Sequence, residues 1–240
     1  MEFIQAVLNA NQEIYSYLSQ GMRAEDHRSM SLGAGGDMSL AIDLMAEKIF
    51  IDHLSSFGTI HTEERGIVAN PHTTAYIVID PIDGSDNLVS HFPYYGTSVA
   101  YFENGICTKA VIVNLANADL FVKDEAGFRR GKLGSSFFKP VEANPYCKLG
   151  LFERAYCSTK VAPLLKKGKI KYRSPGAFAL SLAYAREVSF VIFEGAMRCY
   201  DIEAGRFMCD DLHLYHMEDI FLVSKDKEIF DKIIDLFISN

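Results

Sequence analysis

Eight residues, Asp80-Pro81-Ile82-Asp83-Gly84-Ser85-Asp86-Asn87, constrain this chain more than any other stretch of its sequence. They follow the apolar, β-branched run 75–79, which is typical of a buried strand. Pro81 removes a backbone donor and predicts the end of the strand, and Gly84 permits a sharp turn. The strand should therefore bring two carboxylates and the carbonyl of Ile82 to one place at the end of a sheet.

The chemistry of this turn favours a metal ion and an anion side by side. Asp80, Asp83 and the carbonyl of Ile82 form an all-oxygen group that suits a hard cation such as Mg²⁺. A short helix that begins at Ser85 would direct its first amides to the same place, where they favour a phosphate. Aspartates are also common in turns that bind nothing, so a solvated turn is the alternative interpretation.

Length and composition are those of an ordinary soluble globular protein. The 240 residues are 49% hydrophobic and 23% charged, enough for one large domain or two small ones. The net charge of −7, without a basic stripe, argues against a nucleic-acid partner. No run reaches the ~18 apolar residues of a membrane span. Five scattered cysteines without a CxxC pair, and an acidic start unlike a signal peptide, predict reduced core thiols and a cytoplasmic location.

The first half of the chain predicts helices and an antiparallel sheet. Apolar residues at helical spacing predict helices over 3–20 and 39–53. The glycine-rich stretch 29–38 between them predicts a flexible loop. A strand over 59–64 should run out into an acidic pair, Glu63-Glu64.

Turn signals divide the rest of the chain. Asn104-Gly105 and 125–127 predict the turns of two β-hairpins. The proline- and serine-containing stretch 135–148 predicts a boundary. We therefore expect a layered αβαβα sandwich of the α+β class, with an antiparallel α+β part over 1–145, a smaller α/β part over 146–240 and the site between them. In the second part the expected strands are 149–157, 189–193 and 220–223, and the expected helices are 160–167, 176–186, 202–209 and 225–238.

Three further acidic positions are candidates for the same site as the turn. Glu63-Glu64 lies at a strand end ahead of a glycine, where a solvated turn is the alternative. Asp201 opens an apolar helical run, so it can cap that helix, and a capping carboxylate can also face a metal. Asp43 lies off the apolar stripe of its helix, and the alternative is an exposed polar position.

Together, Glu63, Asp80, Asp83 and Asp201 supply four carboxylates from three segments, and the chain resembles the inositol monophosphatase superfamily of metal-dependent, often lithium-sensitive sugar phosphatases. The octapeptide matches the signature aspartate-proline-aliphatic-aspartate-glycine-threonine/serine-any-asparagine. Three further segments match in the right order, between about residue 3 and residue 210: Asp37-Met38-Ser39 with Asp43, Glu63-Glu64, and Tyr200-Asp201-Ile202-Glu203-Ala204-Gly205.

The resemblance implies a role for each matching residue. Glu63 would orient or deprotonate an attacking water, and the hydroxyl of Ser85, held by Asp43, would polarise that water. Two or three Mg²⁺ ions would be bound by Glu63, Asp80, Asp83, Asp201 and the carbonyl of Ile82. The substrate would be contacted by Asp83, Asp201, the phosphate-holding amides of Gly84 and Ser85, the backbone of Gly176, and Glu194.

The implied function is Mg²⁺-dependent hydrolysis of a phosphate monoester of inositol or a related sugar, in a cytoplasmic homodimer without a nucleic-acid or membrane partner. Such esters hydrolyse very slowly alone, and metal-assisted catalysis fits a site rich in carboxylates. The alternatives are a fructose bisphosphatase or a phosphonucleotide phosphatase of the same superfamily. An inert module that binds phosphoesters is a third alternative, which should have lost a metal carboxylate or Glu63; neither is lost.

Overall fold

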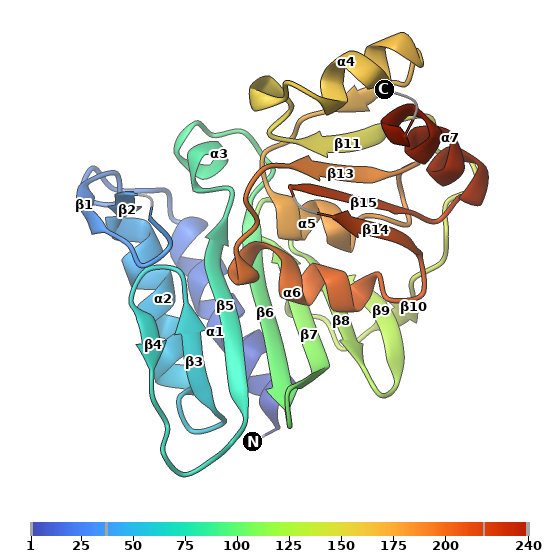
Figure 1. Cartoon of the computed structure of the whole chain (residues 1–240). Coiled ribbons are helices and arrows are strands. Elements are labelled where there is room, and N and C mark those ends of the chain that lie inside the picture. The colour runs from blue at the N-terminus through green and yellow to red at the C-terminus, as the bar shows by residue number, and fades with distance from the viewer. Residues whose placement is uncertain (1, 37, 218, 239–240) are drawn as a thin grey trace.

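The structure is a computed structural model that describes residues 2–36, 38–217 and 219–238. In this part of the chain, helices and two β-sheets alternate in layers (Figure 1). The order confirms the predicted αβαβα sandwich of the α+β class. From one side to the other, the layers are α1 (Phe3–Leu18) with α2 (Ala41–Leu54), the larger sheet, α5 (Phe178–Ala183) with α6 (Cys199–Met208), the smaller sheet, and α4 (Val161–Lys167) with α7 (Lys227–Ile238).

The larger sheet is almost entirely antiparallel. Within the described residues it has eight strands in the order β10-β9-β8-β7-β6-β5-β3-β4, and only β3 and β5 run parallel. Both predicted hairpins are confirmed; Asn104 and Gly105 have φ of 52° and 79°, as a tight hairpin turn requires. The strands are β3 (Thr59–Thr62), β4 (Gly66–Val68), β5 (Tyr76–Asp83), β6 (Gly96–Glu103), β7 (Ile106–Asn114), β8 (Asp119–Asp124), β9 (Gly127–Lys132) and β10 (Phe138–Pro140).

Both faces of this sheet are buried along much of its central strands, β5 to β8. Along β5, Ile77 and Ile79 pack toward α1 and α2, whereas Val78 packs toward α5 and α6. Successive side chains of a strand point to opposite faces, so a strand between two helical layers needs apolar residues at every position. The continuous apolar run before the octapeptide is explained in this way.

The smaller sheet has mixed directions, and part of it was not predicted. In the described chain its order is β12-β11-β13-β15-β14, in which β11 runs parallel to β12 and β13. Strand β14 was missed because its residues, His213–Met217, are only partly buried and mix polar with apolar side chains on both faces. The strands are β11 (Gly150–Glu153), β12 (Tyr172–Arg173), β13 (Val191–Glu194), β14 (His213–Met217) and β15 (Ile220–Ser224).

Several predicted boundaries were wrong for local reasons. The helix expected over 176–186 is shorter, because Gly176 has φ of +89° and the chain becomes helical only at Phe178. The helix expected over 202–209 begins earlier, at Cys199. The loop expected over 29–38 contains two short paired strands, β1 (Ser29–Leu32) and β2 (Met38–Leu40).

Two further sequence expectations meet the structure differently. The cysteines are free but are not all core thiols: only Cys209 is buried, and Cys157 and Cys199 are exposed. The boundary at residues 145 and 146 falls between β10 and β11, but α5 and α6 from the second part cover the larger sheet. The division into two domains therefore stays a prediction. Among the described residues, no helix combines the length and apolar character that crossing a membrane requires.

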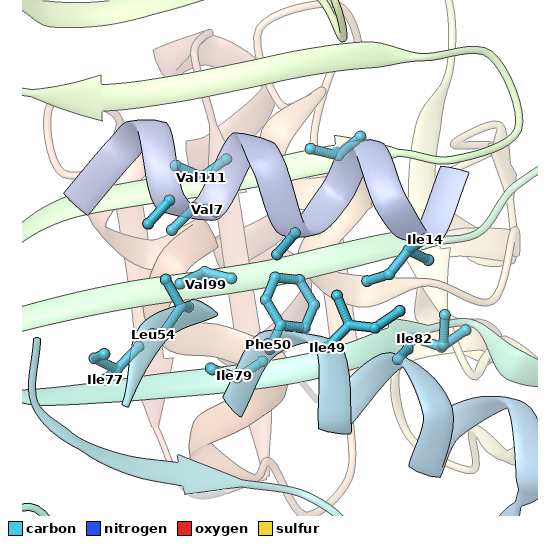
Figure 2. Close-up of a cluster of buried hydrophobic side chains, with 14 of the residues drawn as sticks. Val7, Ile14, Ile49, Phe50, Leu54, Ile77, Ile79, Ile82, Val99 and Val111 are labelled. Atoms are coloured by element: carbon cyan, nitrogen blue, oxygen red, sulfur yellow. The ribbon is translucent and has the colours of Figure 1, made fainter. Parts of the chain in front are cut away.

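The core between α1, α2 and the larger sheet gives a stability prediction. Phe50 is fully buried at its centre, among Leu54, Ile79 and Val99 (Figure 2). Phe50→Ala should lower the free energy of unfolding by about 3–5 kcal/mol, because it removes apolar contacts and leaves a cavity. Chemical denaturation measures this loss.

The matched control is Phe137→Ala, since Phe137 is 73% exposed. That substitution should change the free energy of unfolding by no more than about 0.5 kcal/mol. Equal effects of the two substitutions would contradict the packing described here.

Candidate metal and phosphate site

A β-bulge in β5 places the aspartates of the octapeptide. Asp80 pairs with Ser98 of β6 and Asp83 pairs with Gly96, so three steps along β5 oppose two steps along β6. The strand therefore continues past Pro81, and the expectation that it ends there was wrong. Proline is tolerated because a bulge interrupts the ladder in which its missing N–H would donate. In a regular strand, residues three apart face opposite sides; the extra residue removes this opposition.

Three carboxylates from three segments converge beside the bulge. Glu63 directly follows β3, Asp80 lies in β5, and Asp201 lies in the first turn of α6. One oxygen from each lies within 4.8 Å of the others. The Glu63 side chain is only 14% exposed, so the solvated-turn alternative for Glu63 was wrong. Asp201 is the third residue of α6 and not its N-cap, although its carboxylate does accept from the N-cap amide, that of Arg198.

Asp83 lies nearby but has a different partner in the structure. Its Oδ2 accepts a hydrogen bond of 2.7 Å from the amide of Leu180, in the first turn of α5. First-turn amides have no partner within their own helix, so this bond stabilises the start of α5. Within the described residues Asp83 is not part of the three-carboxylate group, and its role as a metal ligand stays a prediction.

Arg198 lies among the carboxylates and was missed from the sequence. Its Nη1 lies 2.7 Å from Glu63 Oε1, its Nε 3.1 Å from Asp201 Oδ2, and its Nη2 3.3 Å from Asp201 Oδ1. Arg198 precedes Asp201 by three residues, and this spacing brings opposite charges together at a helix start. That spacing was a signal available in the sequence.

Burial raises the pKa values of the carboxylates at the site. Burial raises the pKa of Glu63 to about 7, although the Arg198 guanidinium acts against this shift. Burial, and then the charges of Glu63, Asp83 and Asp201, raise the pKa of Asp80 well above its ordinary value. Burial likewise raises the pKa of Asp83, although the amide of Leu180 opposes the shift. Such mutual repulsion is relieved when positive charge is added.

The residues present fit a hard divalent cation. All three converging ligands are carboxylates, and oxygen ligands are those that Mg²⁺ prefers in proteins. The carbonyl of Ile82 lies in the bulge, and the amide of Ile82 donates to Asp80 Oδ1 at 3.0 Å. This bond holds the Asp80 side chain against the turn. The predicted ligands Glu63, Asp80 and Asp201 therefore come together, and the carbonyl of Ile82 as a ligand stays a prediction.

The proposed pair of Asp43 and Ser85 is only partly visible. Asp43 is buried; its Oδ2 accepts from the amide of Leu40 at 3.0 Å, and among the described residues its buried Oδ1 has no partner. Burial, and to a lesser degree the charges of Glu64 and Asp86, raise the pKa of Asp43 to about 7. Asp43 is thus not the exposed position of the alternative interpretation. The hydrogen bonds of the described residues do not include one from Ser85 to Asp43, and that contact stays a prediction.

The predicted phosphate-holding turn and the predicted substrate loop meet at Gly84. This residue has φ of +86° and precedes α3 (Ser85–Val89), as the octapeptide predicted. A Cβ at Gly84 would lie 3.0 Å from the carbonyl oxygen of Gly176, so only glycine fits this approach. Asn87, the last residue of the octapeptide, donates to the carbonyls of Tyr94 and Pro175 at 2.7 Å each. These bonds hold the two backbone segments together.

A buried carboxylate that the sequence analysis missed supports this loop. Glu153, at the end of β11, is 1% exposed, and its Oε2 accepts from the amide of Gly176 at 2.8 Å. Its Oε1 accepts from the hydroxyl of Ser181, which also lies 3.0 Å from the Tyr94 hydroxyl. A glutamate at the end of an apolar strand was the available signal. Glu153 fixes the Gly176 loop against the octapeptide turn.

Glu194, predicted to contact a sugar, has another role in the structure. Its carboxylate accepts from the amides of Lys160 and Val161 at 3.1 and 3.0 Å, and from the hydroxyl of Ser158. It therefore caps the start of α4, and a sugar would have to share these oxygens. Its contact with substrate stays a prediction.

The early matching segment and the glycine-rich loop before it pack against the acidic pair. The amides of Ala34 and Gly35 donate to the carbonyls of Glu64 and Glu63 at 2.9 and 2.7 Å. A Cβ at Gly35 would lie 2.8 Å from Glu63 Cγ, so glycine permits this close approach. Ser39 bonds the Glu64 carboxylate. Asp37, which opens the segment, lies outside the described residues.

Comparison with known proteins agrees with this geometry. The chain is 30% identical over 202 residues to "Nus factor SuhB" of Xylella fastidiosa, covering 72% of this chain and 69% of that one. It is 28% identical over 204 residues to "Fructose-1,6-bisphosphatase/inositol-1-monophosphatase" of Methanothermobacter thermautotrophicus, covering 76% and 71%. The crystal structure of extragenic suppressor protein suhB from Bartonella henselae has the same fold, with a TM-score of 0.79, 18% identity and 97% coverage of each chain. The model of the inositol monophosphatase family matches residues 2–211, and the chain belongs to that family.

Proposed function

We propose that this protein is a Mg²⁺-dependent phosphatase that hydrolyses a phosphate monoester of inositol or a related sugar. The observation that carries the proposal is the convergence of Glu63, Asp80 and Asp201 within 4.8 Å, beside the turn at Gly84. An inert binding module would have no use for this amount of buried negative charge. Membership of a family with phosphatase relatives supports the same reaction class.

The residues of the chain divide the work of hydrolysis in this proposal. Bound Mg²⁺ would activate the nucleophile and neutralise the phosphoryl oxygens. Glu63, Asp80, Asp201 and the carbonyl of Ile82 would hold it, with Asp83 beside them. Glu63 would also orient the attacking water and accept its proton, which is the role that the family resemblance gives it.

The substrate half of the proposal rests on the turn and the loop that meet at Gly84. The amides of Gly84 and Ser85 would hold the phosphate, and the Gly176 loop would border the sugar. A related protein carries the name of both a fructose bisphosphatase and an inositol monophosphatase, which supports a fructose bisphosphate as the alternative substrate. A phosphonucleotide is a further alternative. The proposal also includes a cytoplasmic homodimer, for which light scattering should give twice the mass of one chain.

An activity panel tests the proposal. Purified protein should release phosphate from inositol monophosphate or from a related sugar phosphate in Mg²⁺, and this activity should vanish in EDTA and return when Mg²⁺ is added in excess. Asp80→Asn should lower the rate at least ~100-fold, because it removes a ligand charge from the centre of the site. The conservative control is Asp52→Asn on the exposed side of α2, which should keep the rate. Full turnover in EDTA, or a normal rate for Asp80→Asn, would refute the mechanism.

Ser85 separates a catalytic role from a structural one. If its hydroxyl polarises the attacking water, Ser85→Ala should lower kcat about 100-fold and leave KM nearly unchanged. Ser85→Thr should keep most of the activity because it keeps the hydroxyl. The double variant with Asp43→Asn should be little worse than either single variant, since the two residues act as a unit. A Ser85→Ala protein that melts earlier but has the wild-type kcat would show that Ser85 only stabilises the turn.

Asp43 gives a pH dependence of stability. Its pKa rises from an ordinary 3.8 to about 7 on folding, so the folded state holds its proton more tightly than the unfolded state. This contribution to stability is complete below about pH 4 and is lost as the pH rises through about 7. In EDTA, wild-type protein should therefore lose thermal stability relative to Asp43→Asn between pH 5 and pH 8.

Thermal melts of the wild type and Asp43→Asn across this pH range measure the difference between their melting temperatures. The change of this difference with pH reports on Asp43, because the other carboxylates titrate in both proteins. Asp52→Asn, an exposed carboxylate on the same helix, should give a curve parallel to that of the wild type. Parallel curves for the wild type and Asp43→Asn would show that Asp43 does not take up a proton on folding.

A further inference from the structure

Arg198 contacts two of the three carboxylates that would hold a metal ion. Its guanidinium bridges two of the three converging carboxylates, with one contact of 2.7 Å to Glu63 and contacts of 3.1 and 3.3 Å to the two oxygens of Asp201. Its Nη1 also donates to the carbonyl of Gly35 at 3.3 Å. The group is held from three segments of the chain.

A guanidinium and a divalent cation cannot share these oxygens freely. Both are positive, and each needs lone pairs that point at it. Arginine does not lose its charge in proteins, so it can make way for a cation only by moving. The side chain of Arg198 is 33% exposed, so part of it already faces the solvent into which it would move. Because the guanidinium and the cation repel each other at this distance, we expect a bound metal to break the contact to Glu63 or those to Asp201.

We propose that Arg198 is a built-in competitor of the metal ion, which neutralises Glu63 and Asp201 until a divalent cation displaces it. The inference rests on the proposed metal site. It adds that Arg198 sets the cation concentration at which the site fills, and that filling releases the guanidinium from the Gly35 loop. The effective affinity for metal is lower than the carboxylates alone would give, because displacement costs the ion pairs.

The loop around Gly35 also contacts Arg198 and Glu63, so displacement of Arg198 affects it. A Cβ at Gly35 would lie 3.1 Å from Arg198 Nη1 and 2.8 Å from Glu63 Cγ, so the backbone lies directly against both side chains. When Arg198 moves, the loop loses the hydrogen bond from Nη1 to the Gly35 carbonyl but keeps the one from the Gly35 amide to the Glu63 carbonyl. Metal binding is thereby linked to the packing of this loop.

The opposite role for Arg198 makes the opposite prediction. If Arg198 instead held Glu63 and Asp201 in the orientation that metal binding needs, its removal would weaken metal binding. If it competes, its removal should strengthen metal binding and destabilise the metal-free protein. The sign of the change in affinity therefore distinguishes the two roles.

Calorimetric titration of the EDTA-treated, dialysed protein with MnCl₂ and with MgCl₂ tests the inference. Arg198→Gln should bind the metal about fivefold more tightly than the wild type, given the strength of a partly exposed ion pair. Arg198→Lys keeps the charge but loses the planar fork, so its affinity should lie between the two. Arg206→Gln removes an equal charge from the exposed side of the same helix, and should leave the dissociation constant within about twofold of the wild-type value.

Thermal melts provide a second readout that does not depend on activity. In EDTA, Arg198→Gln should melt at a lower temperature than the wild type, and saturating MnCl₂ should raise its melting temperature by a larger increment. Weaker or unchanged metal binding by Arg198→Gln, beside a wild type that does bind, would overturn this inference and leave the proposed function intact. If Arg198→Gln does not fold, Arg198→Lys decides: tighter binding than the wild type supports competition, and weaker or equal binding overturns it. Absence of binding in every variant would overturn both the inference and the proposed metal site.

Discussion

The bulge between Asp80 and Asp83 is the constraint on which the site depends. One extra residue in β5 interrupts the alternation of side chains between the two faces of the sheet. The two aspartates at the end of the strand therefore reach two different sets of partners. Asp80 meets Glu63 and Asp201, whereas Asp83 accepts from the amide of Leu180 and fixes the start of α5. The end of β5 thus connects the acidic centre, which is the group of Glu63, Asp80 and Asp201, to the start of α5 in the middle helical layer.

Burying this much negative charge requires compensation from the rest of the fold. Lost hydration, and then repulsion from neighbouring carboxylates, raise the pKa values of Glu63 and Asp80. The structure answers with the guanidinium of Arg198 at Glu63 and Asp201, and with backbone amides at Asp80 and Asp83. In such a site a metal ion can replace the guanidinium of Arg198 as the positive partner of the carboxylates. We propose that metal binding takes place by this exchange.

The sequence predicted what depends on local pattern. The octapeptide, the hairpin turn at Asn104 and the alternation of helical and apolar runs each follow from neighbouring residues, and the fold class was confirmed with them. The continuation of β5 past Pro81 was not predictable, because it depends on the pairing of β6. The cap that Glu194 provides for α4 was missed for the same reason, since its partners lie more than thirty residues away in the chain.

The acidic centre was predicted in part. The family resemblance grouped Glu63, Asp80, Asp83 and Asp201, and the structure brings one oxygen each of Glu63, Asp80 and Asp201 within 4.8 Å of one another. The motif did not include Arg198 or Glu153, whose importance comes from tertiary contacts rather than from a turn or a periodic pattern. Long-range contacts of single polar side chains are the hardest feature of this site to predict from the sequence.

The proposed catalysis and the role of Arg198 both depend on a divalent cation that binds between Glu63, Asp80 and Asp201. An anomalous difference map from crystals grown with MnCl₂ tests this binding most directly. We predict a peak within about 2.5 Å of carboxylate oxygens from all three residues, with the guanidinium of Arg198 withdrawn from at least one of its carboxylates. A fully occupied manganese position elsewhere, with Arg198 still bridging Glu63 and Asp201, would contradict it.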